Sequence, residues 1–190
     1  MIIHPSYIQS SKEGKTAIDP YTMLMNENIV LLFSEINDDL AQSIIAQLML
    51  LEVKNPKADI QLYINSPGGS VTAGLAILDV MNKVSNPIST VAVGSCASMA
   101  AVLLAAGAPG KRYALPHAQI MIHQPLGGAQ GQASDVLIAA ERIKNVRSEL
   151  NGLLAEYTGK PIAQIEKDTD RDNYLSAQSA LEYRLIDKIL

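Results

Sequence analysis

The chain has 190 residues, 48% of them hydrophobic, and a formal net charge of −4. This composition argues against intrinsic disorder, and the lack of a basic block argues against a nucleic-acid partner. No apolar run approaches the roughly 20 residues of a membrane span, and the amino-terminal sequence does not resemble a secretory signal. The single cysteine, Cys96, excludes an internal disulfide and is interpreted as a small buried apolar group. We expect a cytoplasmic protein without a membrane partner.

The first half of the chain alternates predicted strands and helices. Residues 1–20 are polar and interrupted by proline and glycine, which predicts an arm or loop. A short strand is predicted over residues 29–33, and Asn37 is the expected cap of the helix that follows. Residues 60–65 alternate strictly between apolar and polar, as a half-buried strand does. A helix is predicted from residue 71 to about residue 84.

The second half begins with a β-branched, buried strand over residues 88–93, followed by a small-residue turn and a helix over residues 99–106. Two short strands are predicted over residues 112–115 and 119–123. A helix over about residues 134–157 would be about 36 Å long, more than the sheet before it needs. We expect this helix to project and pack against another subunit; packing across its own domain is the alternative.

Strand–helix units recur at intervals of about thirty residues, beginning near Ile29, Ile60, Ile88 and Gln119. The repeat predicts one α/β domain with a largely parallel sheet. A short helix, a charged link over residues 169–173 and a last helix close the chain. Because ligands of parallel sheets bind beyond the carboxyl ends of the strands, reactive side chains there are the candidates for a site.

Three such features stand just past predicted strands. The Gly68-Gly69 turn permits unusual backbone angles and suits an oxyanion or a substrate backbone better than a phosphate, with a plain turn as the alternative. Ser98, at a helix start, is either a nucleophile beside free backbone N–H groups or only a helix cap. His123 is the candidate base by position, or a structural histidine.

The segments that hold these features resemble the proteolytic subunits of Clp proteases (ClpP), from about residue 29 to residue 189. The matching stretches are YINSPGGSVTAG (63–74), ASM (97–99), GKRYALP (110–116), MIHQPLGG (121–128) and DTDRDN (168–173). The resemblance implies a crotonase/ClpP-like α/β fold with a projecting handle helix. It divides the single domain into an arm or axial loop (1–20), a head (21–122), a handle (123–160) and a carboxyl-terminal part of the head (161–190).

The resemblance also implies a serine endopeptidase. Ser98 would be its nucleophile, His123 its general base and Asp172 its orienting carboxylate. The backbone N–H groups of Gly69 and Met99 would form the oxyanion hole. The choice of Asp172 within the charged link comes from the resemblance, because spacing alone leaves the other carboxylates of the link open.

Two further pairs of residues take roles from the resemblance. Leu126 and Val71 would lie along the backbone of an extended substrate. Asp170 and Arg171 match an ion pair between rings. The implied assembly consists of heptameric rings, two of which stack into a chamber, and an AAA+ unfoldase feeds it unfolded polypeptides. That partner uses ATP, so no cofactor and no metal are expected for this chain.

Several residues depart from the family pattern. Ala100 and Val102 replace Gly and Phe, Lys83 replaces an apolar residue of the unfoldase docking pocket, and the usual Arg near Tyr21 is missing. Arg184 replaces a helix-ending glycine, which costs about 1 kcal/mol if its backbone is left-handed. These departures suggest a divergent paralogue, weakly active or regulatory in a mixed ring with a second ClpP. Two competing hypotheses are a crotonase-type acyl-CoA enzyme and a non-catalytic ring subunit.

Overall fold

The computed structural model describes residues 6–11 and 14–190. Its strands are β1 Tyr7–Ser11, β2 Gly14–Ile18, β3 Ile29–Leu32, β4 Ile60–Ser66, β5 Ile88–Ala97, β6 Arg112–Ala114, β7 Gln119–Ile122, β8 Asn173–Ser176 and β9 Lys188–Ile189. Its helices are α1 Pro20–Asn26, α2 Asp38–Lys54, α3 Val71–Lys83, α4 Met99–Ala105, α5 Ala133–Thr158, α6 Ile162–Asp168 and α7 Ala177–Tyr183.

The central sheet has the order β3-β4-β5-β6-β9, and every neighbouring pair on this path is parallel. β5 is longer than predicted: its residues 90–92 pair with β6, and its residues 95–97 pair with β7. β8 runs antiparallel to β7 and was not predicted. The expected α/β fold with a largely parallel sheet is confirmed.

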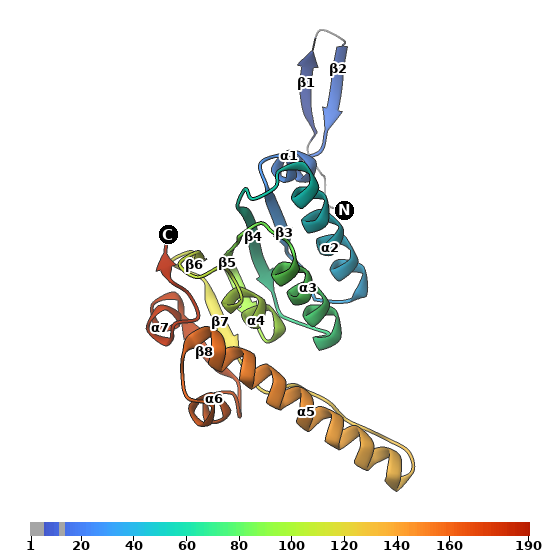
Figure 1. The fold of residues 1–190 in the computed structure, drawn as a ribbon, viewed down its shortest axis with the longest axis vertical. Helices are drawn as coiled ribbons and strands as arrows, with labels where there is room; N and C mark the ends of the chain where they lie inside the picture. Colours follow the sequence, from blue (N-terminus) through green and yellow to red (C-terminus); the bar gives the residue numbers. More distant parts are fainter. Residues whose placement is uncertain (1–5, 12–13) are drawn as a thin grey trace.

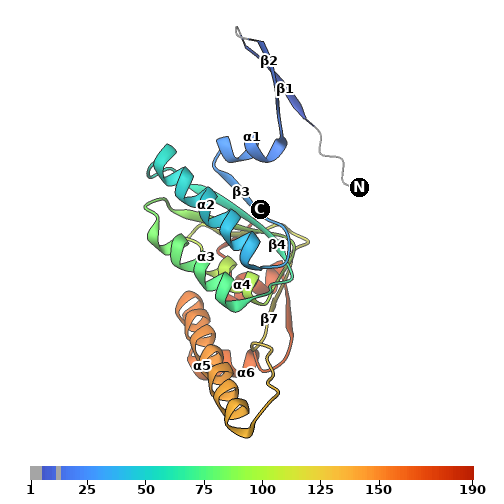
Figure 2. The ribbon, with the colours of Figure 1, turned by 90° about the vertical axis from the view of Figure 1, so that its right-hand side faces the viewer.

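The core lies between this sheet and the helices on one of its faces. Figures 1 and 2 show α2, α3 and α4 side by side on that face. The predicted alternation of β4 is confirmed, because Ile60, Leu62 and Ile64 are fully buried whereas the residues between them are half-buried. α2 begins after its predicted cap, where the Asn37 side chain accepts a hydrogen bond from the Leu40 N–H at 2.8 Å.

A partly buried ion pair joins the amino ends of β6 and β9. The Arg112 guanidinium donates to both carboxylate oxygens of Asp187, at 2.6 and 3.0 Å, and also to the Tyr157 carbonyl at 2.8 Å. Burial raises the pKa of Asp187, but the hydrogen bonds and the charge of Arg112 outweigh it and hold the pKa below its usual value. The pair thus ties β6 to β9 and to the end of α5.

The long helix α5 has 26 residues and leaves the rest of the protein at its amino-terminal half (Figure 1). Its buried residues all lie near its carboxyl end, from Leu150 onward. In the free half, Leu137 and Ile138 are 71% and 69% exposed. This half therefore projects as predicted and does not pack across its own domain. No helix of the described residues has the length and apolarity needed to cross a membrane.

The amino-terminal segment differs from the prediction. Its described residues pair as the antiparallel hairpin β1–β2, which stands at the opposite end of the molecule from α5 (Figures 1 and 2). The expected arm or loop over residues 1–20 is thus a hairpin where it is described; residues 1–5 and 12–13 lie outside the described residues. α1 was also missed, because Pro20 was interpreted as a break, whereas proline is well accommodated in the first turn of a helix.

Candidate active site

Ser98 stands at the junction between β5 and α4. Its backbone has φ 57° and ψ −126°, a conformation that residues other than glycine rarely adopt and that costs about 1–3 kcal/mol. The Ser98 N–H donates to the Met121 carbonyl at 2.8 Å, which holds the turn against β7. The Ser98 side chain makes no cap hydrogen bond to the helix. The interpretation of Ser98 as only a helix cap is therefore wrong.

His123 follows β7, the strand that pairs with the end of β5, so it lies beside Ser98 at the same edge of the sheet. Its Nε2 atom lies 2.8 Å from the Ser98 Oγ, which is hydrogen-bond distance. The His123 side chain is 12% exposed. The two residues that sequence position singled out are thus in direct contact.

Asp172 completes this chain of hydrogen bonds. Its Oδ1 atom lies 2.9 Å from the His123 Nδ1, and its side chain is 56% exposed. The register of β8 explains the choice of carboxylate: Asn173 pairs with Ile122, so the residues just outside this pair, Asp172 and His123, lie opposite each other. Asp170 instead lies 3.4 Å from Arg147 on α5.

The turn after β4 approaches Ser98 closely and depends on its glycines. Gly68 and Gly69 have φ values of 91° and 144°. A Cβ atom on Gly68 would lie 2.7 Å from the Ser98 Cβ, and one on Gly69 would collide with the Ile36 carbonyl. Side chains are thus excluded at both positions by space as well as by conformation.

This turn leaves backbone donors beside Ser98. It is held by the Ile36 N–H, which donates to the Gly68 carbonyl at 2.7 Å, and by the Ser70 N–H, which donates to the Ile36 carbonyl at 2.8 Å. Neither bond uses the Gly69 N–H. Met99 is the first residue of α4, where the N–H has no acceptor within the helix. The Gly69 and Met99 amides thus keep the donors that the predicted oxyanion hole needs, and their role there stays a prediction.

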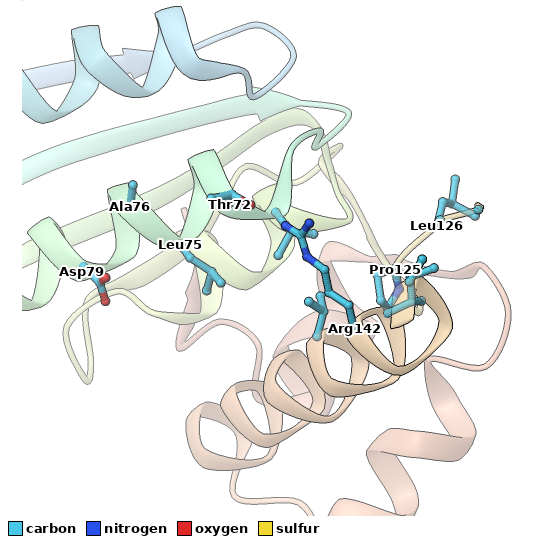
Figure 3. A pocket seen from close by; sticks show the side chains of 13 residues that line it. Thr72, Leu75, Ala76, Asp79, Pro125, Leu126 and Arg142 are labelled. Atoms are coloured by element: carbon cyan, nitrogen blue, oxygen red, sulfur yellow. The ribbon is translucent and has the colours of Figure 1, made fainter. Parts of the chain in front are cut away.

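A small cavity is lined by Ser98, and a larger groove lies next to it. A small cavity of about 20 Å³ is lined by Ser98, His123 and Val71 among others. A larger groove of about 570 Å³ runs between α3 and α5 and is bordered by the segment 125–128. Val71 lines both hollows, and Leu126, which is 88% exposed, lines the groove (Figure 3). Both residues expected to lie along a substrate backbone thus line the groove, and Val71 also lines the cavity at Ser98.

A buried network that was not predicted holds the Asp172 segment in place. The Gln124 N–H, next to His123, donates to the Thr169 carbonyl at 2.6 Å. The Thr169 hydroxyl, fully buried, lies 2.9 Å from the Oδ1 of Asn151 on α5. The signal in the sequence is faint: Asn151 is a polar residue beside the apolar stripe of a long helix, where a buried amide needs a partner.

The remaining candidate residues lie away from this contact. Arg171, whose side chain is 92% exposed, has its Nε atom 3.8 Å from the Asp170 carboxylate, so this pair lies at the surface. Cys96 is fully buried, and burial raises the pKa of its thiol, which confirms its interpretation as a small core residue. Among the described residues no cluster of three or more His, Cys, Asp or Glu side chains could hold a metal ion.

The comparison with known families agrees with this geometry. In this site a hydroxyl, an imidazole and a carboxylate are connected in a row by hydrogen bonds. A family model described as Clp protease matches residues 12–190, nearly the whole chain. The chain therefore belongs to the Clp protease family.

Proposed function

We propose that this chain is a serine endopeptidase in which Ser98, His123 and Asp172 form the catalytic triad. The observation that carries the proposal is the unbroken chain of hydrogen bonds, 2.8 Å from Ser98 to His123 and 2.9 Å from His123 to Asp172. These distances suit proton transfer without rearrangement. The strained backbone of Ser98 supports the same role, because such strain gathers at functional sites.

Acylation follows from the arrangement. The Ser98 Oγ attacks the carbonyl carbon of the scissile peptide bond while its proton passes to the His123 Nε2. The Asp172 carboxylate accepts a hydrogen bond from the His123 Nδ1–H and stabilises the imidazolium that forms. The negative charge that develops on the substrate oxygen is stabilised by the Gly69 and Met99 N–H groups. His123 then gives its proton to the leaving amine, and an acyl-enzyme remains on Ser98.

Deacylation uses the same groups in the reverse direction. His123 takes a proton from a water molecule, which attacks the acyl carbonyl carbon, and then returns the proton to the Ser98 Oγ as the second product leaves. All proton transfers involve residues of this chain or water. The proposed chemistry needs neither a metal nor a cofactor from this chain.

The substrate in this proposal is an extended, unfolded polypeptide. Leu126 and Val71 border the groove next to the Ser98 cavity, and the segment around Leu126 lies outside any strand. An extended substrate could pair with this segment through backbone hydrogen bonds, in the manner of an added strand. Backbone pairing of this kind binds many sequences, which suits an enzyme that degrades unfolded chains.

We further propose an assembly of stacked heptameric rings in the cytoplasm, fed by an AAA+ unfoldase. Membership of the Clp protease family supports this, as does the free half of α5 with its exposed apolar side chains. In this assembly α5 is the handle that meets the other ring. Asp170 and Arg171, exposed beside the handle, would contact that ring.

A mixed ring with a second ClpP is the alternative that a specific observation favours. Lys83, at the end of α3, is exposed and places a charge where the family has an apolar residue of the unfoldase docking pocket. Such a subunit would work best beside a paralogue that docks the unfoldase. A crotonase-type acyl-CoA enzyme would share the fold, but it would have no need of a His123–Asp172 pair aligned on Ser98.

The test is covalent labelling with a fluorophosphonate probe, combined with native mass spectrometry. We expect the unmodified chain to take up one probe per subunit and Ser98→Ala to take up none. Ser95→Ala is the matched control, because Ser95 lies on the same strand outside the triad and should leave labelling unchanged. Labelling that persists in Ser98→Ala would reject Ser98 as the nucleophile. The native mass, with and without a second ClpP, distinguishes a single-chain ring from a mixed one.

A further inference from the structure

The groove between α3 and α5 carries two charged side chains in an otherwise mainly apolar lining. Arg142 comes from α5, and Asp79 comes from α3. In Figure 3 Arg142 extends from α5 towards the first turn of α3, near Thr72 and on the side of Pro125 and Leu126. Asp79 lies two helical turns farther along α3, at the other end of the groove. The end nearer the segment 125–128 is therefore the positive one.

Arg142 differs from its neighbours on α5 because it has no partner within the described part of the chain. Lys144 lies 3.4 Å from Glu141, and Arg147 lies 3.4 Å from Asp170. No ion pair or hydrogen bond of Arg142 is found among residues 6–11 and 14–190. A guanidinium with free donors beside an apolar surface is a good site for a carboxylate, which it can bind through two parallel hydrogen bonds.

We propose that Arg142 gives the site a preference for substrates with glutamate at the residue that supplies the scissile carbonyl. The inference rests on the proposed peptidase function. The groove shares Val71 and Pro125 with the small cavity that Ser98 lines, so the two lie side by side. A long side chain next to the bond that is cleaved would pass Val71 and Pro125 to reach the groove. The methylene groups of glutamate would pack on the apolar lining, for example Leu75, and its carboxylate would meet Arg142.

The test uses peptidyl diphenyl phosphonates that differ only in their last residue, an analogue of glutamate, glutamine or lysine. These probes phosphonylate the nucleophilic serine and release phenol, so intact mass measures the rate even where turnover is slow. For the unmodified chain we expect the glutamate probe to react about three to ten times faster than the glutamine probe. The lysine probe should be the slowest, and added salt should reduce the difference.

Arg142→Gln should bring the glutamate-to-glutamine ratio to about one. Lys144→Gln is the matched control, since it removes a cation from the same helix outside the groove and should leave the ratio unchanged. A ratio that is equal in the unmodified chain and in Arg142→Gln would overturn the inference while leaving the peptidase intact. If no probe and no fluorophosphonate react with Ser98, the proposed function fails and the inference fails with it. Native masses are compared to exclude an effect through assembly.

Discussion

The two ends of the central sheet use similar residues for different purposes. At the amino ends of β6 and β9, Arg112 and Asp187 form a pair whose side chains are only 11% and 22% exposed and which binds neighbouring carbonyls as well. At the carboxyl ends of β5 and β7, His123 meets an Asp172 that is 56% exposed and, on its other side, the Ser98 hydroxyl. At the first end the two charges satisfy each other and hold β6, β9 and the end of α5 together. The second leaves its carboxylate open to solvent, as the proposed proton transfer allows.

The largest effect is expected at the reactive end. Asp172→Asn should slow probe labelling of Ser98 by about 10³–10⁴-fold, because an amide at this position can no longer hold His123 in the tautomer that accepts the Ser98 proton. The urea midpoint should barely change, since Asp172 is largely exposed. Asp168→Asn is the control for a nearby carboxylate without contact to His123. Equal labelling rates for the two variants would remove Asp172 from the triad.

At the Arg112–Asp187 end of the sheet we expect a loss of stability without a loss of probe labelling. Asp187→Asn should destabilise the protein by about 3 kcal/mol, because the Arg112 guanidinium keeps its buried position and loses its counter-ion. The measurement is urea unfolding at a fixed protein concentration, and probe labelling of the folded fraction should be unchanged. Asp59→Asn removes the partner of the exposed Lys111, at 2.6 Å, and should cost less than about 1 kcal/mol. Similar losses in both variants would contradict the difference in burial.

The same pair predicts a pH dependence. The pKa of Asp187 is lowered in the folded protein, so below pH 4 the unfolded chain binds a proton that the folded chain still resists. The stabilising effect of Asp187 is therefore fully present above about pH 4 and is lost as the pH falls through the lowered value. The difference in unfolding free energy between the unmodified chain and Asp187→Asn should shrink as the solution is acidified. A constant difference between pH 7 and pH 3 would contradict this sign.

A smaller effect is expected for the hydrogen-bond network that holds Thr169 against Asn151 and the residue next to His123. Thr169→Val keeps the shape of the side chain but removes a buried hydroxyl that lies 2.9 Å from the Asn151 amide oxygen and 2.8 Å from the Ile165 carbonyl, which should cost about 2 kcal/mol. Because the Thr169 carbonyl binds the residue next to His123, we also expect slower probe labelling. Thr169→Ser keeps the hydroxyl and should retain most of the stability and most of the labelling rate. The network has no positioning role if Val and Ser behave alike in the labelling assay.

The smallest predicted effect is a gain. Arg184 ends α7 with φ 70° and ψ 24°. This is the left-handed conformation in which an arginine in place of the family's glycine is expected to lower stability. Arg184→Gly should therefore raise the unfolding free energy by about 1 kcal/mol. Glu182→Gly, inside the same helix, should lower it by a similar amount. Thermal or urea unfolding measures both, and a loss in Arg184→Gly would show that the arginine side chain contributes more than its backbone costs.

Local patterns predicted the fold better than they predicted the contacts between distant segments. The alternation of β4 and the cap at Asn37 follow from neighbouring residues, and so do the positions of Ser98 and His123 just past strand ends. The choice of Asp172 depends on the register of β8, a four-residue strand of mixed burial that carries no pattern of its own. The link from Thr169 to Asn151 spans 18 positions and rests on one hydrogen bond, which no periodicity can reveal.

Ser98 and Arg184 both have a positive φ. Substitution by glycine would remove the backbone strain at either position, but only at Arg184 would it do so without loss of a proposed function. Glycine at position 98 would relax the turn and make folding more favourable, and it would also remove the hydroxyl that we propose as the nucleophile. Selection for a sturdier protein and selection for a working one therefore pull this single codon in opposite directions.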